Sequence, residues 1–194
     1  MITRRQAIEN DKISWEQQYA ASFRNPADLL AWLGIDIGTM SDSVDINSEF
    51  PMRVPRAFAS RMQNGNPDDP LLRQVLPLKN ERIVVDGFSK DPLIEADYNF
   101  GNGIIKKYHG RALLIATGTC AIHCRYCFRR HYPYADESLT REKISSMMAE
   151  LRGMDDLDEV ILSGGDPLSL SDARLGELLD ALATLPNLKR LRLH

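Results

Sequence analysis

Residues 111–130 read RALLIATGTCAIHCRYCFRR, and this stretch decides the fold. The first seven residues, Arg111 to Thr117, form an apolar run of strand length, which is typical of a strand buried on both faces. A loop that contains every cysteine of the chain follows at once. In parallel α/β folds, chemistry gathers beyond the carboxyl ends of strands. The stretch therefore predicts a buried strand that delivers a reactive loop.

The sequence after this loop alternates helical and strand patterns. Thr140 can cap a helix with one apolar stripe, and Leu175 to Leu182 show the same spacing. The runs Glu159 to Leu162 and Leu188 to His194 are typical of strands. Strand, helix, strand, helix, strand predicts an α/β fold with a parallel sheet and right-handed crossovers.

The first hundred residues have a different, mostly helical and irregular pattern. We expect a domain boundary near residue 105, with a helical accessory region at 1–104 and an α/β region at 105–194. Three helices are predicted before a dense turn cluster at residues 65–70. They are a helix capped by Ser14 over Trp15 to Ala21, one opened by Asn25-Pro26 and stopped by Gly34, and one from Pro55 to Met62.

Composition excludes several classes of protein. The 194 residues are 43% hydrophobic and 26% charged, with 24 Lys+Arg against 27 Asp+Glu and a formal net charge of −3. Such a chain can bury a core, and it has no general electrostatic attraction for nucleic acid or anionic membranes. No run approaches a membrane span or a signal peptide, so we expect a cytoplasmic protein. The length is too short for a complete eightfold barrel of about 250 residues.

Three cysteines, Cys120, Cys124 and Cys127, fall within eight positions. An odd number at this spacing cannot close a disulfide framework, so the cysteines are interpreted as metal ligands. Three thiolates can hold three irons of a cubane cluster and leave the fourth open to a substrate. A Cys3His zinc site with His123 or His131 is the alternative, although structural zinc sites usually carry separated ligand pairs. A regulatory thiol cluster is a further alternative.

A second motif, Gly164-Gly165-Asp166, follows the second predicted strand. Two glycines let the backbone approach a ligand closely, and the same sequence is also ordinary turn chemistry. Its place one βα unit after the cysteine loop favours a binding role.

Several stretches resemble a known family. The spacing CxxxCxxC with Tyr126 before the third cysteine is similar to the signature of the radical S-adenosylmethionine superfamily. Within it the chain resembles the lysine 2,3-aminomutases, most of all the branch that makes β-lysine for elongation factor P. The stretches that carry the resemblance are GNPDDPLLRQVLP (65–77), DPLIE (91–95), KKYHGRALLIATGTC (106–120), CAIHCRYCFRRHYPY (120–134) and SGGDPL (163–168).

The resemblance implies a fold, a reaction and a set of cofactors. The fold would be the first three βα units of a partial (β/α)6 barrel. The reaction is an isomerisation that moves the amino group of lysine from C2 to C3. It uses a 4Fe-4S cluster, S-adenosyl-L-methionine as the source of a radical, and pyridoxal 5′-phosphate. The implied partners are lysine as a small-molecule substrate, a reductant such as flavodoxin or ferredoxin, and a functional link to elongation factor P.

The resemblance also implies roles for individual residues. Cys120, Cys124 and Cys127 would ligate the cluster. Arg129 would bind the substrate carboxylate, because a planar guanidinium can pair both oxygens. The cofactor contacts would be made by Tyr126, Gly164, Gly165 and Asp166 for S-adenosylmethionine, and by Tyr108 and Arg111 for pyridoxal phosphate. Lys107 stands where free-lysine mutases carry arginine. Arg125 is interpreted as a solvated loop arginine, and His109 and His123 as loop residues rather than catalysts.

Some of the family's machinery has no counterpart in these 194 residues. The lysine that binds pyridoxal phosphate and the acidic residues for the substrate's distal amine belong to the family's C-terminal half. We therefore expect a chain cut after its third strand, without full aminomutase activity and of low stability, because half a barrel exposes apolar surface. The alternatives are a mutase for free lysine or glutamate, and a non-enzymatic Cys3His zinc module.

Overall fold

A computed structural model describes residues 14–134 and 140–194, which form two compact units. Among the described residues, the first unit comprises residues 14–88 together with Ala121–Cys127. The second comprises Ser89–Cys120 together with residues 128–134 and 140–194. The segment between the first and last cysteines therefore belongs to the N-terminal unit, although the chain on both sides of it belongs to the other. The division at residue 105 stays a prediction.

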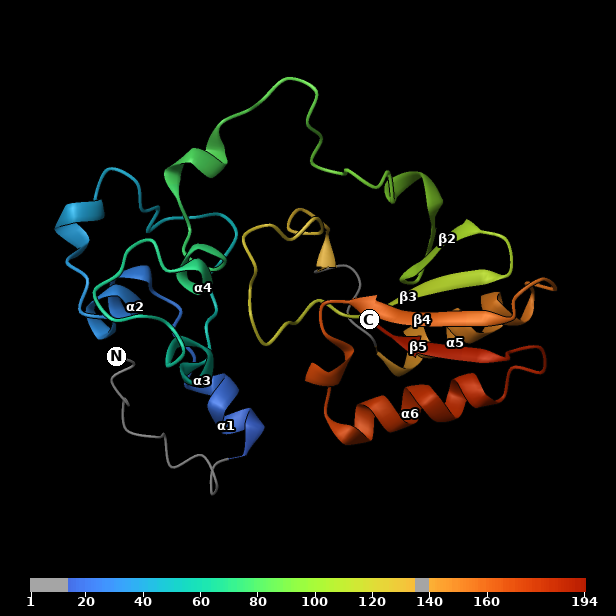
Figure 1. The fold of residues 1–194 in the computed structure, drawn as a ribbon. Helices are drawn as coiled ribbons and strands as arrows, with labels where there is room; N and C mark the ends of the chain where they lie inside the picture. Colours follow the sequence, from blue (N-terminus) through green and yellow to red (C-terminus); the bar gives the residue numbers. More distant parts are fainter. Residues whose placement is uncertain (1–13, 135–139) are drawn as a thin grey trace. The chain divides into compact units, whose positions relative to one another are not determined.

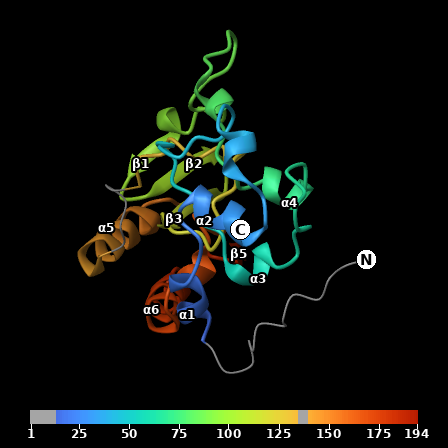
Figure 2. The same cartoon turned by 90° about the vertical axis from the view of Figure 1, so that its left-hand side faces the viewer.

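The first unit consists of short helices joined by long loops (Figures 1 and 2). Its core is a cluster of buried side chains that includes Leu29, Leu30, Leu33 and Leu72, each fully buried. Ile122, from the cysteine segment, packs against this core. The helices are α1 (Trp15–Ala20), α2 (Pro26–Trp32), η2 (Ile37–Met40), α3 (Arg56–Ala59), α4 (Pro70–Arg73) and η3 (Lys79–Arg82).

The predicted caps of this unit are confirmed. The Ser14 hydroxyl accepts a hydrogen bond from the Gln17 backbone, and the Asn25 side chain accepts one from Ala27. Gly34 stops α2 with a φ of +69°, a conformation that glycine adopts without strain. The third predicted helix is shorter than expected, because α3 ends at Ala59.

The second unit is built on a five-stranded sheet in the order β1-β2-β3-β4-β5 (Figure 1). Strands β3, β4 and β5 are parallel, as the sequence predicts, and β1 and β2 are antiparallel to their neighbours. The strands are β1 (Asn99–Gly101), β2 (Ile104–Tyr108), β3 (Arg111–Thr117), β4 (Glu159–Gly164) and β5 (Arg190–Leu193).

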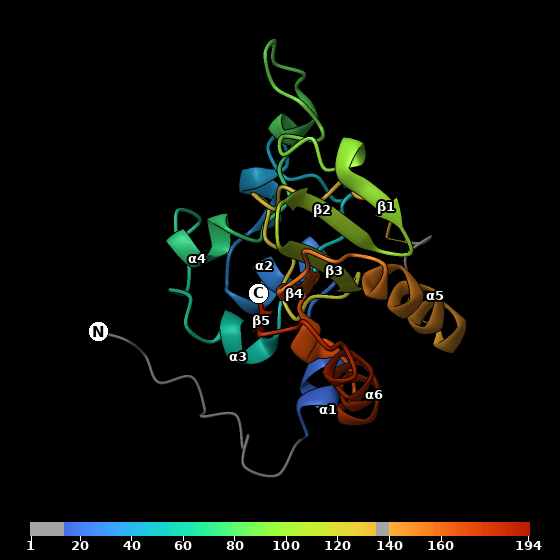
Figure 3. The ribbon, with the colours of Figure 1, turned by 90° about the vertical axis from the view of Figure 1, so that its right-hand side faces the viewer.

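Two helices, α5 (Arg141–Arg152) and α6 (Asp172–Ala183), cover one face of this sheet (Figure 3). Both are crossovers between parallel strands, so right-handed connections place them on the same side. Met147 and Leu151 of α5 and Leu178 and Leu182 of α6 form one core with β3 and β4. Leu113 and Ile161 alternate with these buried positions and point to the opposite face.

The hairpin of β1 and β2 was not predicted. Its turn is Asn102-Gly103, with φ values of +50° and +75°. Two consecutive positive φ values at Asn-Gly define the turn that best matches the twist of antiparallel strands. Asn102 also donates a hydrogen bond to Glu150 of α5, at 2.5 Å. The first parallel strand, β3, therefore has an antiparallel neighbour on its other side.

Candidate functional site

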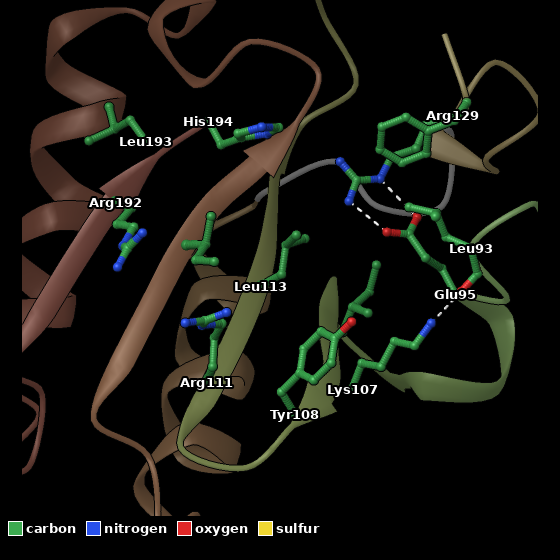
Figure 4. Close-up of a pocket in the computed structure, with 13 residues that line it drawn as sticks. Leu93, Glu95, Lys107, Tyr108, Arg111, Leu113, Arg129, Arg192, Leu193 and His194 are labelled. Atoms are coloured by element: carbon green, nitrogen blue, oxygen red, sulfur yellow. Dashed lines mark hydrogen bonds and ion pairs between the residues drawn. The ribbon is translucent and has the colours of Figure 1, made fainter.

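A cavity of about 530 Å³ lies on the face of the second unit's sheet that the helices leave open (Figure 4). The side chains of Lys107, Tyr108, Arg111 and Leu113 project into it from β2 and β3. Arg129 and Glu95 lie at one end, and Arg192 and His194 come from the strand at the other side. Its lining carries four cationic side chains against one carboxylate, which favours an anionic ligand.

Arg129 is buried at one end of the cavity, with only 5% of its surface exposed. Its Nε and Nη2 donate to the two carboxylate oxygens of Glu95 at 2.8 and 2.7 Å. Nη1 donates to the Ser163 hydroxyl at 2.8 Å. Burial lowers the pKa of Arg129, but the Glu95 carboxylate outweighs this and holds the pKa above its ordinary value. The guanidinium is therefore charged and held in one orientation.

The backbone of Glu95 is held by the Asp91 carboxylate. Asp91 accepts hydrogen bonds from the backbone N–H of Glu95 and of Ala96, both at 3.0 Å, at the start of the 3₁₀ helix η4 (Ala96–Tyr98). These two N–H groups lower the pKa of Asp91. Ile94, between the two carboxylates, has a φ of +54°, which a β-branched residue rarely adopts. This strained turn presents Glu95 to Arg129.

Three arginines surround the carboxylate of Glu159 under the other side of the cavity. Glu159 is 1% exposed and pairs with Arg111, with Arg192 at 2.6 Å and with Arg190 at 3.6 Å. Burial would raise the pKa of Glu159, but the hydrogen bond from Arg111 and the charges of all three arginines lower it. Arg190 also pairs with Asp158 at 3.0 Å, so three guanidiniums face two carboxylates and leave an excess of one positive charge beside the cavity.

Tyr108 and Lys107 differ in how firmly they are held. Tyr108 is 62% exposed and lies along the cavity, where its ring can stack on a planar ligand. Lys107 donates to the Leu93 carbonyl at 3.0 Å, and its ammonium lies 5.3 Å from the centre of the Tyr98 ring. In this structure Lys107 therefore helps to position the segment that carries Glu95.

All three cysteines are free thiols and half-buried. Cys120 is the last residue of the segment Ser89–Cys120 of the second unit, whereas Cys124 and Cys127 belong to the first unit. Within residues 14–134 and 140–194, no three Cys, His, Asp or Glu side chains form a ready-made metal site. The donor set nevertheless fits an iron–sulfur cluster, because its ligands are thiols and these are not tied up in disulfides. Metal ligands are commonly assembled by the binding of the metal itself.

His123, predicted as a loop residue, is engaged within the first unit. Its Nδ1 donates to the Pro51 carbonyl at 2.8 Å, and its ring stacks on Phe50 at 5.4 Å between centroids. Burial lowers the pKa of His123, and nearby arginines add to this effect. The imidazole is neutral at pH 7, and its Nδ1 is not free to bind zinc. His109 is exposed, 3.6 Å from Asp156.

Tyr126, between two of the cysteines, is largely exposed. Its hydroxyl lies 3.5 Å from the Gln74 side chain. Hydrogen bonding with Cys124 and the charge of that group raise the pKa of Tyr126. The phenol therefore stays neutral and open to a planar ligand.

The Gly164-Gly165-Asp166 motif packs against the segment that leads into the cysteine loop. A Cβ on Gly165 would lie 2.2 Å from the Thr119 carbonyl oxygen, and one on Gly164 would lie 2.6 Å from that of Thr117. The N–H of Asp166 donates to the Thr119 carbonyl at 2.8 Å, and its side chain caps the 3₁₀ helix η6 (Pro167–Ser169). The glycines are required here for close backbone packing, whatever ligand they meet.

Arg125, predicted as a solvated loop residue, is instead buried, with 8% of its surface exposed. The prediction was wrong because the carboxylate that pairs with it, Glu81, lies 44 residues earlier in the chain. Glu95 was also missed as a partner of Arg129, from which it is 34 residues away. Nothing in the local sequence marks either glutamate as the partner of a buried arginine.

Comparison with known proteins shows what this chain is similar to. Residues 114–193, from β3 to β5, match the model of the radical SAM superfamily. Over nearly its whole length it is also homologous to proteins named L-lysine 2,3-aminomutase. The chain is 44% identical to that of Escherichia coli K12 over 93% of its residues, and 37% identical to that of Buchnera aphidicola over 96%.

A third homologue, from Haemophilus influenzae, is 35% identical over the whole chain. The chain spans only 53 to 57% of the length of these three relatives. Among residues 14–134 and 140–194, none of the helices combines the length and the hydropathy needed to cross a bilayer.

Proposed function

We propose that this chain forms the cofactor-binding part of a radical S-adenosylmethionine isomerase that moves the amino group of lysine from C2 to C3. The observation that carries the proposal is the CxxxCxxC loop at the carboxyl end of β3, in a chain 44% identical to a protein named L-lysine 2,3-aminomutase. In this proposal the sheet is the start of a partial (β/α)6 barrel, and the open-face cavity lies inside it.

The cofactor contacts are taken from the resemblance to the family, and the chemistry of the residues is compatible with them. Cys120, Cys124 and Cys127 would hold three irons of a 4Fe-4S cluster, and the fourth iron would bind S-adenosylmethionine. Tyr126 offers its exposed ring to the adenine. Gly164, Gly165 and Asp166 would approach the methionyl group. When bound, the cluster and S-adenosylmethionine would supply a radical that removes a hydrogen atom from the substrate, and pyridoxal phosphate would supply a conjugated ring that stabilises the radical while the amino group migrates.

The open-face cavity suits pyridoxal phosphate and an amino acid. Tyr108 would stack on the pyridoxal ring, and Arg111 would bind its phosphate beside the positive cluster around Glu159. Arg129 would bind the substrate carboxylate. A guanidinium carries five N–H donors, and Glu95 and Ser163 accept three of them. A carboxylate would accept the other two, so Arg129 orients the substrate without having to move.

The particular role remains part of the proposal. We favour the branch that serves elongation factor P, with lysine as substrate, a flavodoxin or ferredoxin as reductant, and a cytoplasmic location. The lysine that binds pyridoxal phosphate would lie outside these 194 residues. With a protein as long as the relatives, lysine would be converted to β-lysine and glutamate left unchanged, as mass spectrometry would show. Conversion of glutamate alone would replace this assignment.

The first experiment tests the cluster. The chain is purified anaerobically, reconstituted with iron and sulfide, and examined by electron paramagnetic resonance after reduction. We expect about four irons per chain and a signal that changes when S-adenosylmethionine is added. A Cys124→Ser variant should lose the signal, and an exposed-site control, His109→Ala, should keep it. Stoichiometric zinc without such a signal would support the zinc module and refute the proposal.

A further inference from the structure

The cysteine segment Ala121–Cys127 is bound into the N-terminal unit by one buried ion pair. Arg125, between Cys124 and Cys127, donates from Nε and Nη2 to the two oxygens of Glu81 at 3.0 and 2.6 Å. The side chains of Arg125 and Glu81 are 7% and 16% exposed. Paired, planar hydrogen bonds of this kind fix both the position and the orientation of the guanidinium.

Two further donors of Arg125 bond to groups of the same unit. Nη1 donates to the Phe50 carbonyl at 3.0 Å and Nη2 to the Ser48 hydroxyl at 2.9 Å. The guanidinium also lies 5.0 Å from the centre of the Phe50 ring. Four hydrogen bonds to groups from the η3 helix and from the loop that carries Ser48 and Phe50 leave little freedom for Arg125. This arrangement suits an anchor.

The backbone of the same segment is also fixed. The N–H of Arg125 donates to the Gln74 carbonyl at 2.8 Å, and that of His123 to the Arg53 carbonyl at 3.1 Å. Ile122 packs on the apolar core. Ile122, His123 and Arg125 are therefore each held by the N-terminal unit. Cys124 lies next to Arg125, and Cys127 lies two residues beyond it.

We propose that the Glu81–Arg125 pair is a positioning device that holds Cys124 and Cys127 ready for the metal cluster. This rests on the proposed function only for the identity of the cluster. Neither Glu81 nor Arg125 touches iron in this proposal. They act through the backbone of the loop, as groups behind metal ligands do when they orient those ligands, and their loss commonly lowers metal affinity about 10- to 100-fold.

The test compares Glu81→Gln and Arg125→Lys with a matched control. The control is Asp45→Asn, which breaks another two-bonded arginine pair of the same unit, Arg82–Asp45 at 2.6 and 2.8 Å. Reconstituted protein is mixed with an iron chelator under anaerobic conditions, and bleaching of the cluster absorbance is followed. We expect release about tenfold faster in both test variants and unchanged release in the control. Equal rates in all variants would overturn the proposal.

A second measurement does not depend on iron. The metal-free chain is treated with iodoacetamide, and the rate of alkylation of each cysteine is followed by mass spectrometry. Glu81→Gln should speed the reaction of Cys124 and Cys127 severalfold relative to Cys120, which serves as the internal reference. Parallel changes at all three cysteines, or none, would contradict the anchoring role. Because this readout needs no cluster, it separates failure of the anchor from failure of the proposed function.

Discussion

Two arginines four residues apart, Arg125 and Arg129, each pair with a glutamate in the interior of a different unit. Arg125 donates four hydrogen bonds to Glu81, Phe50 and Ser48 within the N-terminal unit. Arg129 makes three and lies in a cavity of about 530 Å³. Similar chemistry thus serves two purposes. A guanidinium with four donors bonded inside one unit anchors a loop, whereas one with two donors left over beside a cavity can bind a ligand.

The largest effect is expected from removing Glu81, the buried partner of Arg125. Glu81→Ala leaves the Arg125 charge buried without its partner, which typically costs about 3–5 kcal/mol of folding free energy. Urea unfolding followed by far-UV circular dichroism measures this cost. Arg125→Met in the Glu81→Gln background removes the buried charge that needs a partner. This double variant should therefore recover part of the lost folding free energy. A loss below about 1 kcal/mol for Glu81→Ala would mean that the pair does not anchor the loop.

The second arginine should affect binding more than folding. In a protein as long as the relatives, Arg129→Lys should lower kcat/KM for lysine roughly 100-fold, chiefly through KM, because an ammonium cannot reproduce the two-bonded fork. Steady-state kinetics gives the split between kcat and KM. Arg130→Lys is the matched control on the neighbouring residue. An unchanged KM in Arg129→Lys would remove the substrate role from this residue.

A matched pair of serines sharpens the comparison. Ser48 accepts a hydrogen bond from Arg125 at 2.9 Å, and Ser163 accepts one from Arg129 at 2.8 Å. Each change to alanine should cost about 1–2 kcal/mol of stability, since the partner is a charged donor. Only Ser163→Ala should also raise KM. Equal kinetic effects of the two variants, measured on protein as long as the relatives, would erase the distinction between anchor and binding site.

The smallest expected effect is a pH-dependent loss of stability in the second unit. Hydrogen bonds from Lys106 and the Gly110 N–H lower the pKa of Asp156 to about 2, from an ordinary value of 3.8. Because the folded-state pKa is the lower one, Asp156 stabilises the fold above pH 3.8, and this contribution is lost as the pH falls towards 2. Asp156→Asn should therefore flatten the loss of thermal stability over that range, and Asp155→Asn should not. Identical pH profiles of the two variants would contradict this account.

The parallel strands and the two crossover helices could be predicted from the sequence because their signals are local. Apolar runs and a 3.6-residue stripe mark β3, β4 and α5, and a serine or threonine marks each helix start. The hairpin of β1 and β2 was missed although Asn102-Gly103 is a recognised turn signal. Its strands are only three and five residues long, and β2 buries the adjacent residues Ile104 and Ile105, so neither strand shows a clear alternation.

The candidate site divides in the same way. The cysteines and Gly164-Gly165 could be found because spacing along the chain shows them. The partners Glu81 and Glu95 could not, because a single glutamate carries no pattern and its pairing is decided by folding over 44 and 34 residues. Arg125 and Arg129 look alike in sequence, and only their surroundings distinguish the anchor from the binding residue.

The order of the strands has a consequence for synthesis. Because β1 to β5 lie side by side in the order in which they occur in the chain, each strand that leaves the ribosome meets a neighbour already in place. Such a sheet grows by one neighbouring strand at a time, and no strand waits for a partner that is made later than the next one. The segment that carries Cys124 and Cys127 likewise emerges after the helical unit that receives it. Folding of both units can therefore keep pace with translation.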